Sequence, residues 1–262
     1  MASLPQNAKI KIAHLAKSFN ARPVLKDINL EVQKGQSLCI IGTSGCGKSV
    51  TLKCLLGLIT PDSGSITIDG VEMIGQSRKQ REMALNQFGM TFQFGALFDS
   101  LPIWQNIMFR PLQQAKLGRK AAREEAAEIV QQLGLSADVI DQYPAELSGG
   151  MQKRVALARA ISDKPGILLF DEPTSGLDPI TGGVIDNLIT DAVKRLGATA
   201  LTISHDMASV RRIADQVAMI HQGRIIWCGP AEKMHKSGVP EVDQFVNGHP
   251  TGPLTQSASG SK

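Results

Sequence analysis

One stretch near the start of the chain has the residue types and spacing needed to bind a phosphate group. It follows the pattern G-x-x-x-x-G-K-[ST], in which glycines let the backbone turn its N–H groups toward one anion. A helix that starts there would add the partial positive charge of its N-terminus. The lysine would reach the β- and γ-phosphates of a nucleotide, and the serine hydroxyl would bind Mg²⁺. The residues are Gly42, Thr43, Ser44, Gly45, Cys46, Gly47, Lys48 and Ser49.

Two adjacent carboxylates, Asp171 and Glu172, end an apolar run at residues 167–170. A carboxylate at Asp171 can hold the Mg²⁺ shell, usually through water, and Glu172 can polarise an attacking water. Phosphoryl transfer to water needs both a metal that spreads the phosphate charge and a positioned base. The pair could instead cap a helix, but its place downstream of a phosphate loop favours the catalytic interpretation.

A third stretch, residues 147–154, places two glycines after a serine. Ser148 can cap the helix that follows, while Gly149 and Gly150 leave backbone N–H groups uncovered. This predicts a second anion-binding helix terminus, without a lysine. The alternative is an ordinary N-cap with glycines before it, which would be the preferred interpretation if this stretch stood alone.

Strands and helices around these stretches predict a P-loop NTPase core of α/β class. The phosphate loop lies between a short buried strand at 37–41 and a helix closed by Gly57, and 167–171 reads as a strand buried on both faces. Two strands with alternating polarity, 10–15 and 25–32, predict an antiparallel β subdomain. The other predicted elements are strands at 64–70, 89–93 and 198–204, a hairpin at 216–227, and helices at 78–84, 119–133, 179–197 and 207–214.

The domain organisation follows from shifts in pattern. Residues from about 94 to 165 are helical in pattern and predict an inserted helical subdomain within a nucleotide-binding domain spanning 8–248. Residues 249–262 are rich in Pro, Gly, Ser and Thr and predict a flexible tail.

Composition predicts a cytosolic globular protein. The chain is 42% hydrophobic and 20% charged. Its net charge of +4 is too low to indicate a nucleic-acid-binding surface. No apolar stretch is long enough to cross a membrane, and the N-terminus lacks the regions of a signal peptide. Four cysteines without metal-type spacing fit a reducing compartment. Cys46 sits among backbone N–H groups that should favour its thiolate, or it is simply a small residue tolerated in the loop.

With these motifs in view, the sequence resembles the ATP-binding cassette (ABC) family. All of the family's motifs occur in the family's order across roughly residues 8 to 230. Met151 and Phe19 depart from it, since many members have Gln and Tyr there. The matches are Phe19 where an aromatic ring stacks on adenine, 42–49 as Walker A, Gln93 as the Q-loop, 147–151 as the signature motif, 167–172 as Walker B, 175–178 as the D-loop and His205 as the switch histidine.

This resemblance implies a cassette that hydrolyses ATP with Mg²⁺ and is active as a dimer of two copies. ATP would lie between Walker A of one copy and the signature of the other, so that Ser148, Gly149 and Gly150 contact the γ-phosphate held by the partner subunit's Lys48. The resemblance also implies further roles at the nucleotide: catalytic for Glu172, His205 and Gln93, metal binding for Ser49, Gln93 and Asp171, and nucleotide binding for Phe19, Val50 and Asp178 beside the phosphate loop.

A closer resemblance, to the Mla-type ATPases of phospholipid transport between bacterial membranes, starts at residues 89–101. It implies a membrane permease, an MCE-domain lipid-binding protein and a place on the cytoplasmic face of the inner membrane. An apolar patch after the Q-loop would receive the permease, although these side chains could instead pack the helical subdomain. They are Phe94, Leu97, Phe98, Leu101 and Trp104.

Alternatives stay open at this point. The cargo could be an amino acid or an organic solvent. A soluble cassette acting on ribosomes or DNA is disfavoured by the single-cassette length and the low net charge.

Overall fold

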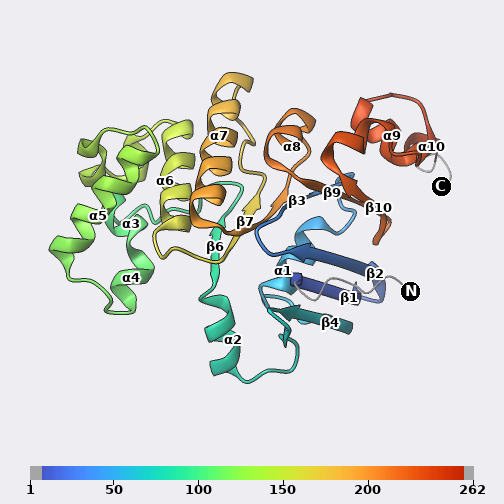
Figure 1. Cartoon of the computed structure of the whole chain (residues 1–262), viewed down its shortest axis with the longest axis horizontal. Helices are drawn as coiled ribbons and strands as arrows, with labels where there is room; N and C mark the ends of the chain where they lie inside the picture. Colours follow the sequence, from blue (N-terminus) through green and yellow to red (C-terminus); the bar gives the residue numbers. More distant parts are fainter. Residues whose placement is uncertain (1–7, 257–262) are drawn as a thin grey trace. The chain divides into compact units, whose positions relative to one another are not determined.

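The computed structural model describes residues 8–256 and divides the chain into two compact units. The first unit comprises the chain up to Leu85 together with the chain from Leu201 onward, and the second runs from Asn86 to Ala200. Figure 1 shows both units in the colours of the sequence.

An antiparallel sheet opens the first unit, as predicted. Its central strand β1 pairs with β2 on one side and β4 on the other. Ile10, Ile12 and Leu15 of β1 are almost fully buried while the residues between them are more exposed, which is the alternation expected of a half-covered sheet. The strands are β1 (Ala8–Phe19), β2 (Arg22–Gln33), β4 (Ser63–Ile68) and β5 (Val71–Glu72).

The phosphate loop directly follows a buried strand that pairs in parallel with another strand of the same unit. Strand β3 (Ser37–Ile41) pairs in parallel with β9 (Gln216–His221), and β9 turns back into β10 (Arg224–Pro230). Strand β8 (Thr199–Ile203) straddles the division between the units, and Ser204 N donates to Ile40 O at 3.3 Å. The helices of this unit that flank the strands are α1 (Lys48–Leu55), α2 (Arg78–Leu85) and α8 (Met207–Ile213).

Residues 249–256 differ from the predicted flexible tail because they fold against the rest of the first unit. The buried Gln244 side chain accepts a hydrogen bond from Leu254 N at 2.8 Å and donates one to His249 O at 3.2 Å. Leu254 packs against the apolar cluster around Val242. The remainder of that predicted tail, residues 257–262, lies outside the described residues. The elements here are η3 (Ala231–Lys236), α9 (Pro240–Asn247) and α10 (Pro253–Gln256).

The second unit combines a parallel strand pair with the predicted group of helices. Strand β6 (Phe88–Thr91) pairs in parallel with β7 (Ile167–Asp171), and the first four residues of β7 are fully buried. The helices that follow β6 contain the apolar spacing seen in the sequence, and Gly134 and Gly197 end α5 and α7 with positive φ. They are α3 (Ile103–Ile107), α4 (Phe109–Gln113), α5 (Arg119–Gln132), η1 (Ala137–Asp141), η2 (Pro144–Glu146), α6 (Gly149–Ile161) and α7 (Pro179–Leu196).

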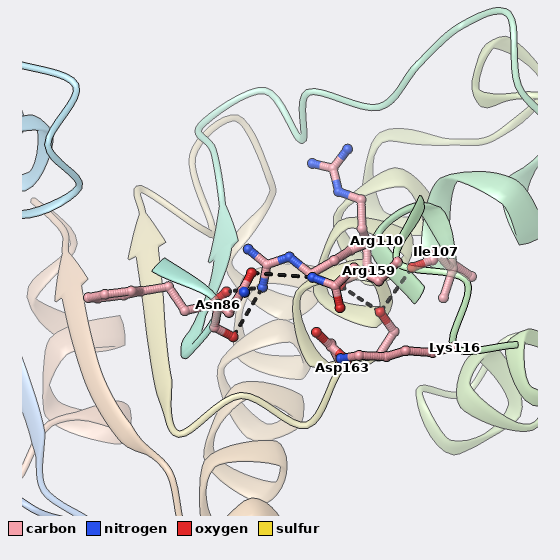
Figure 2. Close-up of polar contacts among 9 residues, drawn as sticks. Asn86, Ile107, Arg110, Lys116, Arg159 and Asp163 are labelled. Atoms are coloured by element: carbon pink, nitrogen blue, oxygen red, sulfur yellow. Dashed lines mark hydrogen bonds and ion pairs between the residues drawn. The ribbon is translucent and has the colours of Figure 1, made fainter. Parts of the chain in front are cut away.

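Polar contacts fix the ends of these helices to their neighbours (Figure 2). Arg110 of α4 donates to Phe88 O at 2.8 Å, which ties the helix to the start of β6. Ser162, just after α6, donates to Ile107 O of α3 at 3.0 Å. Lys116 and Asp163 form an ion pair of 2.6 Å near the surface. None of the helices within residues 8–256 is long and apolar enough to span a membrane.

Because of Cys54 in α1, we expect the free energy of unfolding to fall as the pH rises through the alkaline range. Its side chain is 3% exposed, and burial raises the pKa of the thiol from 9.0 to about 11. Because the folded pKa lies above the unfolded one, the neutral thiol contributes fully below pH 9 and this contribution is lost as pH rises toward 11. The shift of about two pKa units corresponds to about 2 to 3 kcal/mol.

We therefore expect the stability difference between the wild-type chain and Cys54→Ala to change by about that amount between pH 8 and pH 11. Urea unfolding of both proteins across this range measures the difference, and the subtraction removes the titration of other groups. Parallel pH profiles for the two proteins would contradict the burial of an ionisable thiol at this position.

Candidate nucleotide-binding and catalytic site

Glycine is required at two positions of the phosphate loop because the backbone passes close to neighbouring strands. Gly42 and Gly47 have φ of 146° and 114°. A Cβ on Gly42 would lie 2.3 Å from Ile220 O of β9, and one on Gly47 would lie 2.5 Å from a methyl carbon of Leu25 on β2. The loop backbone is thus held tightly between two strands of the first unit, and this packing also fixes the direction of its N–H groups.

Lys48 and the start of α1 form the cationic end of this loop. The Lys48 ammonium donates to Gly42 O at 2.7 Å and to Thr43 O at 3.0 Å, so it lies against the loop. Gly47 is the N-cap of α1 and has no side chain that could bond the first N–H groups of the helix. The partial positive charge at the start of α1 suits an anion, and Ser49 lies in the same first turn.

Cys46 corrects one expectation from the sequence. Its side chain is only 7% exposed, and burial raises the pKa of the Cys46 thiol, while the Lys48 charge and the backbone N–H groups of Lys48 and Cys46 act in the opposite direction. Desolvation outweighs the cationic surroundings, so the thiolate is not favoured. The alternative interpretation, a small residue packed in the loop, fits the structure.

Phe19 and His205 provide accessible rings in the first unit. Phe19 ends β1 with 42% of its surface exposed, and the Lys17 ammonium lies 5.6 Å from its ring centroid. His205 is exposed at the end of β8, directly before Asp206, which caps α8 by accepting from Ala208 N at 2.9 Å. Both rings are exposed at the surface, and their roles at a nucleotide stay predictions.

The carboxylate pair lies at the end of β7 in the second unit, as predicted. Glu172 has φ of 50°, a left-handed conformation that is uncommon for a residue with a side chain. Its carbonyl oxygen accepts from Ser175 N at 3.1 Å, which closes a tight turn directly after the strand. The carboxylates are thus presented at the carboxyl end of a buried strand.

The donors that the sequence assigns to Mg²⁺ have suitable chemistry. Mg²⁺ prefers oxygen ligands and binds through one or two carboxylates together with phosphate oxygens and water. A hydroxyl at Ser49, a carboxylate at Asp171 and an amide at Gln93 are ligands of this kind. Within the part of the chain that the structure describes, no group of three His, Cys, Asp or Glu side chains gathers as a ready-made metal site.

The signature stretch forms a capped helix terminus. Ser148 accepts a hydrogen bond from Met151 N at 3.4 Å, which confirms its predicted capping role. A Cβ on Gly149 would meet nothing within 4 Å, so the backbone there is uncovered. Asp178 likewise caps α7, with hydrogen bonds from the side chain and backbone of Thr181 holding the pKa of its carboxyl below the usual value. Contacts of these residues with a nucleotide stay predictions.

The apolar segment after Gln93 divides into exposed and buried residues. Phe94 is 86% exposed and Phe98 is 42% exposed, with its ring 4.7 Å from that of Phe109. Trp104 is only 7% exposed and lies under the Arg119 guanidinium, so it packs the helical part and is not available to a partner. The predicted docking stretch from Phe94 to Trp104 is thus shortened at its far end.

Sequence reasoning missed three polar residues that hold this segment and its neighbours. Asn106 is fully buried and binds the backbone of Phe98 through Phe98 N at 2.7 Å and Phe98 O at 3.1 Å. Arg159 of α6 donates to the carbonyls of Gly95 and Ala96, both at 2.7 Å. Lys153 is the third. The sequence did contain a signal for Asn106, because an asparagine within the mostly apolar run of residues 103–109 is expected to be buried and hydrogen-bonded.

Comparison with known proteins identifies the family. A family profile described as "ABC transporter" matches residues 25–175. The chain belongs to the ABC transporter family. A probable ribonucleotide transport ATP-binding protein, Mkl of Mycobacterium leprae, is 37% identical over 254 residues, covering 97% of this chain and 73% of that protein. The chloroplastic protein TRIGALACTOSYLDIACYLGLYCEROL 3 of Arabidopsis thaliana is 36% identical, covering 94% and 75%.

Further relatives include an importer subunit and solved cassettes. The methionine import ATP-binding protein MetN 1 of Yersinia pestis is 39% identical, covering 94% of this chain and 69% of that protein. The post-hydrolysis dimer of the cassette MJ0796 with ADP and Pi has a TM-score of 0.78 at 26% identity, covering 85% of this chain and 98% of that chain. The cassette cbiO1 of Clostridium perfringens has a TM-score of 0.79 at 29% identity, covering 93% and 96%.

Family membership and the solved cassettes confirm the predicted α/β fold with a P-loop NTPase core. This ABC chain is an ATPase that binds ATP.

Proposed function

We propose that this chain is the ATP-hydrolysing subunit of a transporter that moves phospholipid, working as two copies with a membrane permease and an MCE-domain protein. The observation that carries the proposal is the exposed Phe94 segment, which is held in place next to Gln93 by Asn106 and Arg159. Exposed apolar side chains that gather on one segment mark a docking site, and Phe92 and Phe98 near Phe94 are each at least 40% exposed.

The nucleotide chemistry assigns one task to each motif. Lys48 and the N–H groups of the loop bind the β- and γ-phosphates, while Phe19 stacks on the adenine ring. Glu172 orients and deprotonates the attacking water, and His205 contacts the γ-phosphate. Ser49, Asp171 and Gln93 would hold Mg²⁺, which would spread the charge of the phosphates. Val50 and Asp178 complete the surroundings of the nucleotide.

A second copy of the chain completes each site in this proposal. The α6 N-terminus at Ser148, Gly149 and Gly150 carries N–H groups that suit a γ-phosphate but lacks a cation of its own in the capping turn. Two helix termini closing on one polyanion give ATP a higher affinity for the closed dimer than for separate copies. The dimeric arrangement of MJ0796 supports this.

Phospholipid is the proposed cargo because two observations agree on lipid. Residues 89–101 resemble the Mla-type ATPases, and the Arabidopsis relative is named after a galactolipid, trigalactosyldiacylglycerol. The second candidate cargo is an amino acid, because a methionine import ATP-binding protein is among the relatives, at 39% identity. The proposed place of the chain is the cytoplasmic face of the inner membrane, bound there through the permease.

Co-purification tests the proposal. The chain is expressed with a tag in its native host, extracted in mild detergent, and its partners and bound lipids are identified by mass spectrometry. We expect a polytopic permease, an MCE-domain protein and phospholipid, with ATP turnover that rises when phospholipid is added. If methionine rather than phospholipid stimulates ATP turnover of the purified complex, the proposed cargo is wrong and an amino acid takes its place. Stable association with ribosomes would overturn a transport role.

Phe94→Asp is expected to reduce permease recovery by about tenfold or more, because it places a charge where an apolar contact is buried. The amount of permease retained per mole of tagged chain measures the effect. Val71→Asp is the matched control, since Val71 is another exposed apolar residue, 55% exposed on β5. Equal recovery with both variants would remove Phe94 from the docking surface.

A further inference from the structure

Lys153 of α6 binds acceptors from three different motif segments within the second unit. Its ammonium donates to Gln93 O, to Glu172 O at 3.5 Å and to Ser175 Oγ at 3.4 Å. Ser175 Oγ in turn lies 3.5 Å from Gln93 O, so the three acceptors surround one cation. An ammonium has three N–H donors, and each can be directed at one of these oxygens.

The surroundings of Lys153 strengthen this arrangement. Its side chain lines a small cavity together with apolar side chains of α6, β7 and α7, among them Ala156, Phe170 and Ile185. Burial lowers the pKa of Lys153, and the negative charge of Glu172 acts in the opposite direction. A partly desolvated ammonium makes stronger hydrogen bonds than one in water, because charge-assisted bonds gain from a low local dielectric.

We propose that Lys153 is a positioning residue that holds the Glu172 turn and the Gln93 segment in their reactive arrangement. The left-handed backbone of Glu172 is an uncommon state that a neighbour has to stabilise, and the Lys153 ammonium binds the carbonyl of that same residue. Lys153 touches main-chain oxygens and a serine hydroxyl, so it acts through Glu172 and Gln93. The inference rests on the catalytic roles proposed for these two residues.

The position of Lys153 on α6 gives this contact a further consequence. Ser148 caps the same helix a little more than one turn before Lys153. In the proposed dimer Ser148 meets the nucleotide of the partner copy. A displacement of α6 caused by that nucleotide is therefore transmitted through the Lys153 side chain to the backbone of Gln93 and Glu172.

Lys153→Met tests the inference in the full-length chain purified with its permease. Methionine keeps the length of the side chain but has no N–H donor. We expect kcat for ATP to fall about tenfold or more while the KM and the dissociation constant for ATP change by less than about twofold, because the interaction lost is realised at the reacting centre. Lys153→Arg, which keeps charge and donors, is expected to recover a substantial part of kcat.

Lys116→Met is the matched control. It removes the same charge from the same unit, where Lys116 makes the ion pair with Asp163 seen in Figure 2. We expect its kcat to equal that of the wild-type chain, since exposed ion pairs contribute little. The melting temperatures of all the variants are measured alongside.

The outcomes separate this inference from the proposed function. Wild-type kcat in Lys153→Met, with Glu172→Gln inactive, would overturn the inference alone. A kcat loss in Lys153→Met that is matched by a lower melting temperature and by an equal loss in Lys153→Arg would also overturn it, because that pattern marks a structural role. Wild-type turnover in Glu172→Gln would instead overturn the base assigned under the proposed function.

Discussion

Glu172→Gln is expected to lower steady-state ATP hydrolysis by about 10²- to 10⁴-fold, the usual contribution of a positioned general base. The amide keeps the size of the side chain and cannot take a proton from water. ATP binding should be retained, because the phosphate loop, Lys48 and the start of α1 are unchanged. Bound ATP then persists, and a dimer closed around it accumulates.

Two measurements check this expectation. Phosphate release gives kcat, and size-exclusion chromatography with ATP detects the accumulated dimer. Glu124→Gln is the control, since Glu124 is exposed on α5 and removing its charge leaves the catalytic groups intact. An unchanged hydrolysis rate in Glu172→Gln would show that Glu172 is not the base.

Features that depend on a few neighbouring residues were predictable from the sequence. The strand, glycine loop and helix around Lys48 were predicted because each has a local signal, and α5 and α7 end within one residue of the predicted limits at 133 and 197. Ser148 was predicted as a cap for the same reason, since a cap and its helix are adjacent in the chain. The order of these signals was sufficient to predict the fold class.

Features that depend on distant segments were not predictable. Cys46 lies among N–H groups in the sequence pattern, but packing decides its burial and so its pKa. The composition of residues 249–256 suggested a flexible tail, whereas one buried side chain, Gln244, orders them through two hydrogen bonds. Lys153 is the sharpest case, because the oxygens it binds come from residues 60, 19 and 22 positions away.

Mixing two inactive variants is expected to restore ATP hydrolysis if each site is shared between two copies. Lys48→Ala removes the cation of the phosphate loop, and Ser148→Arg places a bulky cation where the signature must approach the nucleotide. Each variant alone damages both sites of a homodimer. A mixed dimer combines the intact loop of one copy with the intact signature of the other in one of its two sites.

The amount recovered distinguishes a shared site from a site within one chain. Random pairing makes about half of the dimers mixed, and each holds one intact site of two, so independent sites give about a quarter of the wild-type rate. Sites formed within one chain would give no recovery at all, because every chain carries a defect. The measurement is hydrolysis after the two variants are mixed and their exchange is verified with differently tagged chains, and bound ATP is counted per dimer. One stably bound ATP per mixed dimer supports the shared site even where hydrolysis needs both sites. Verified mixed dimers that show no ATP retention and no turnover would overturn the shared site.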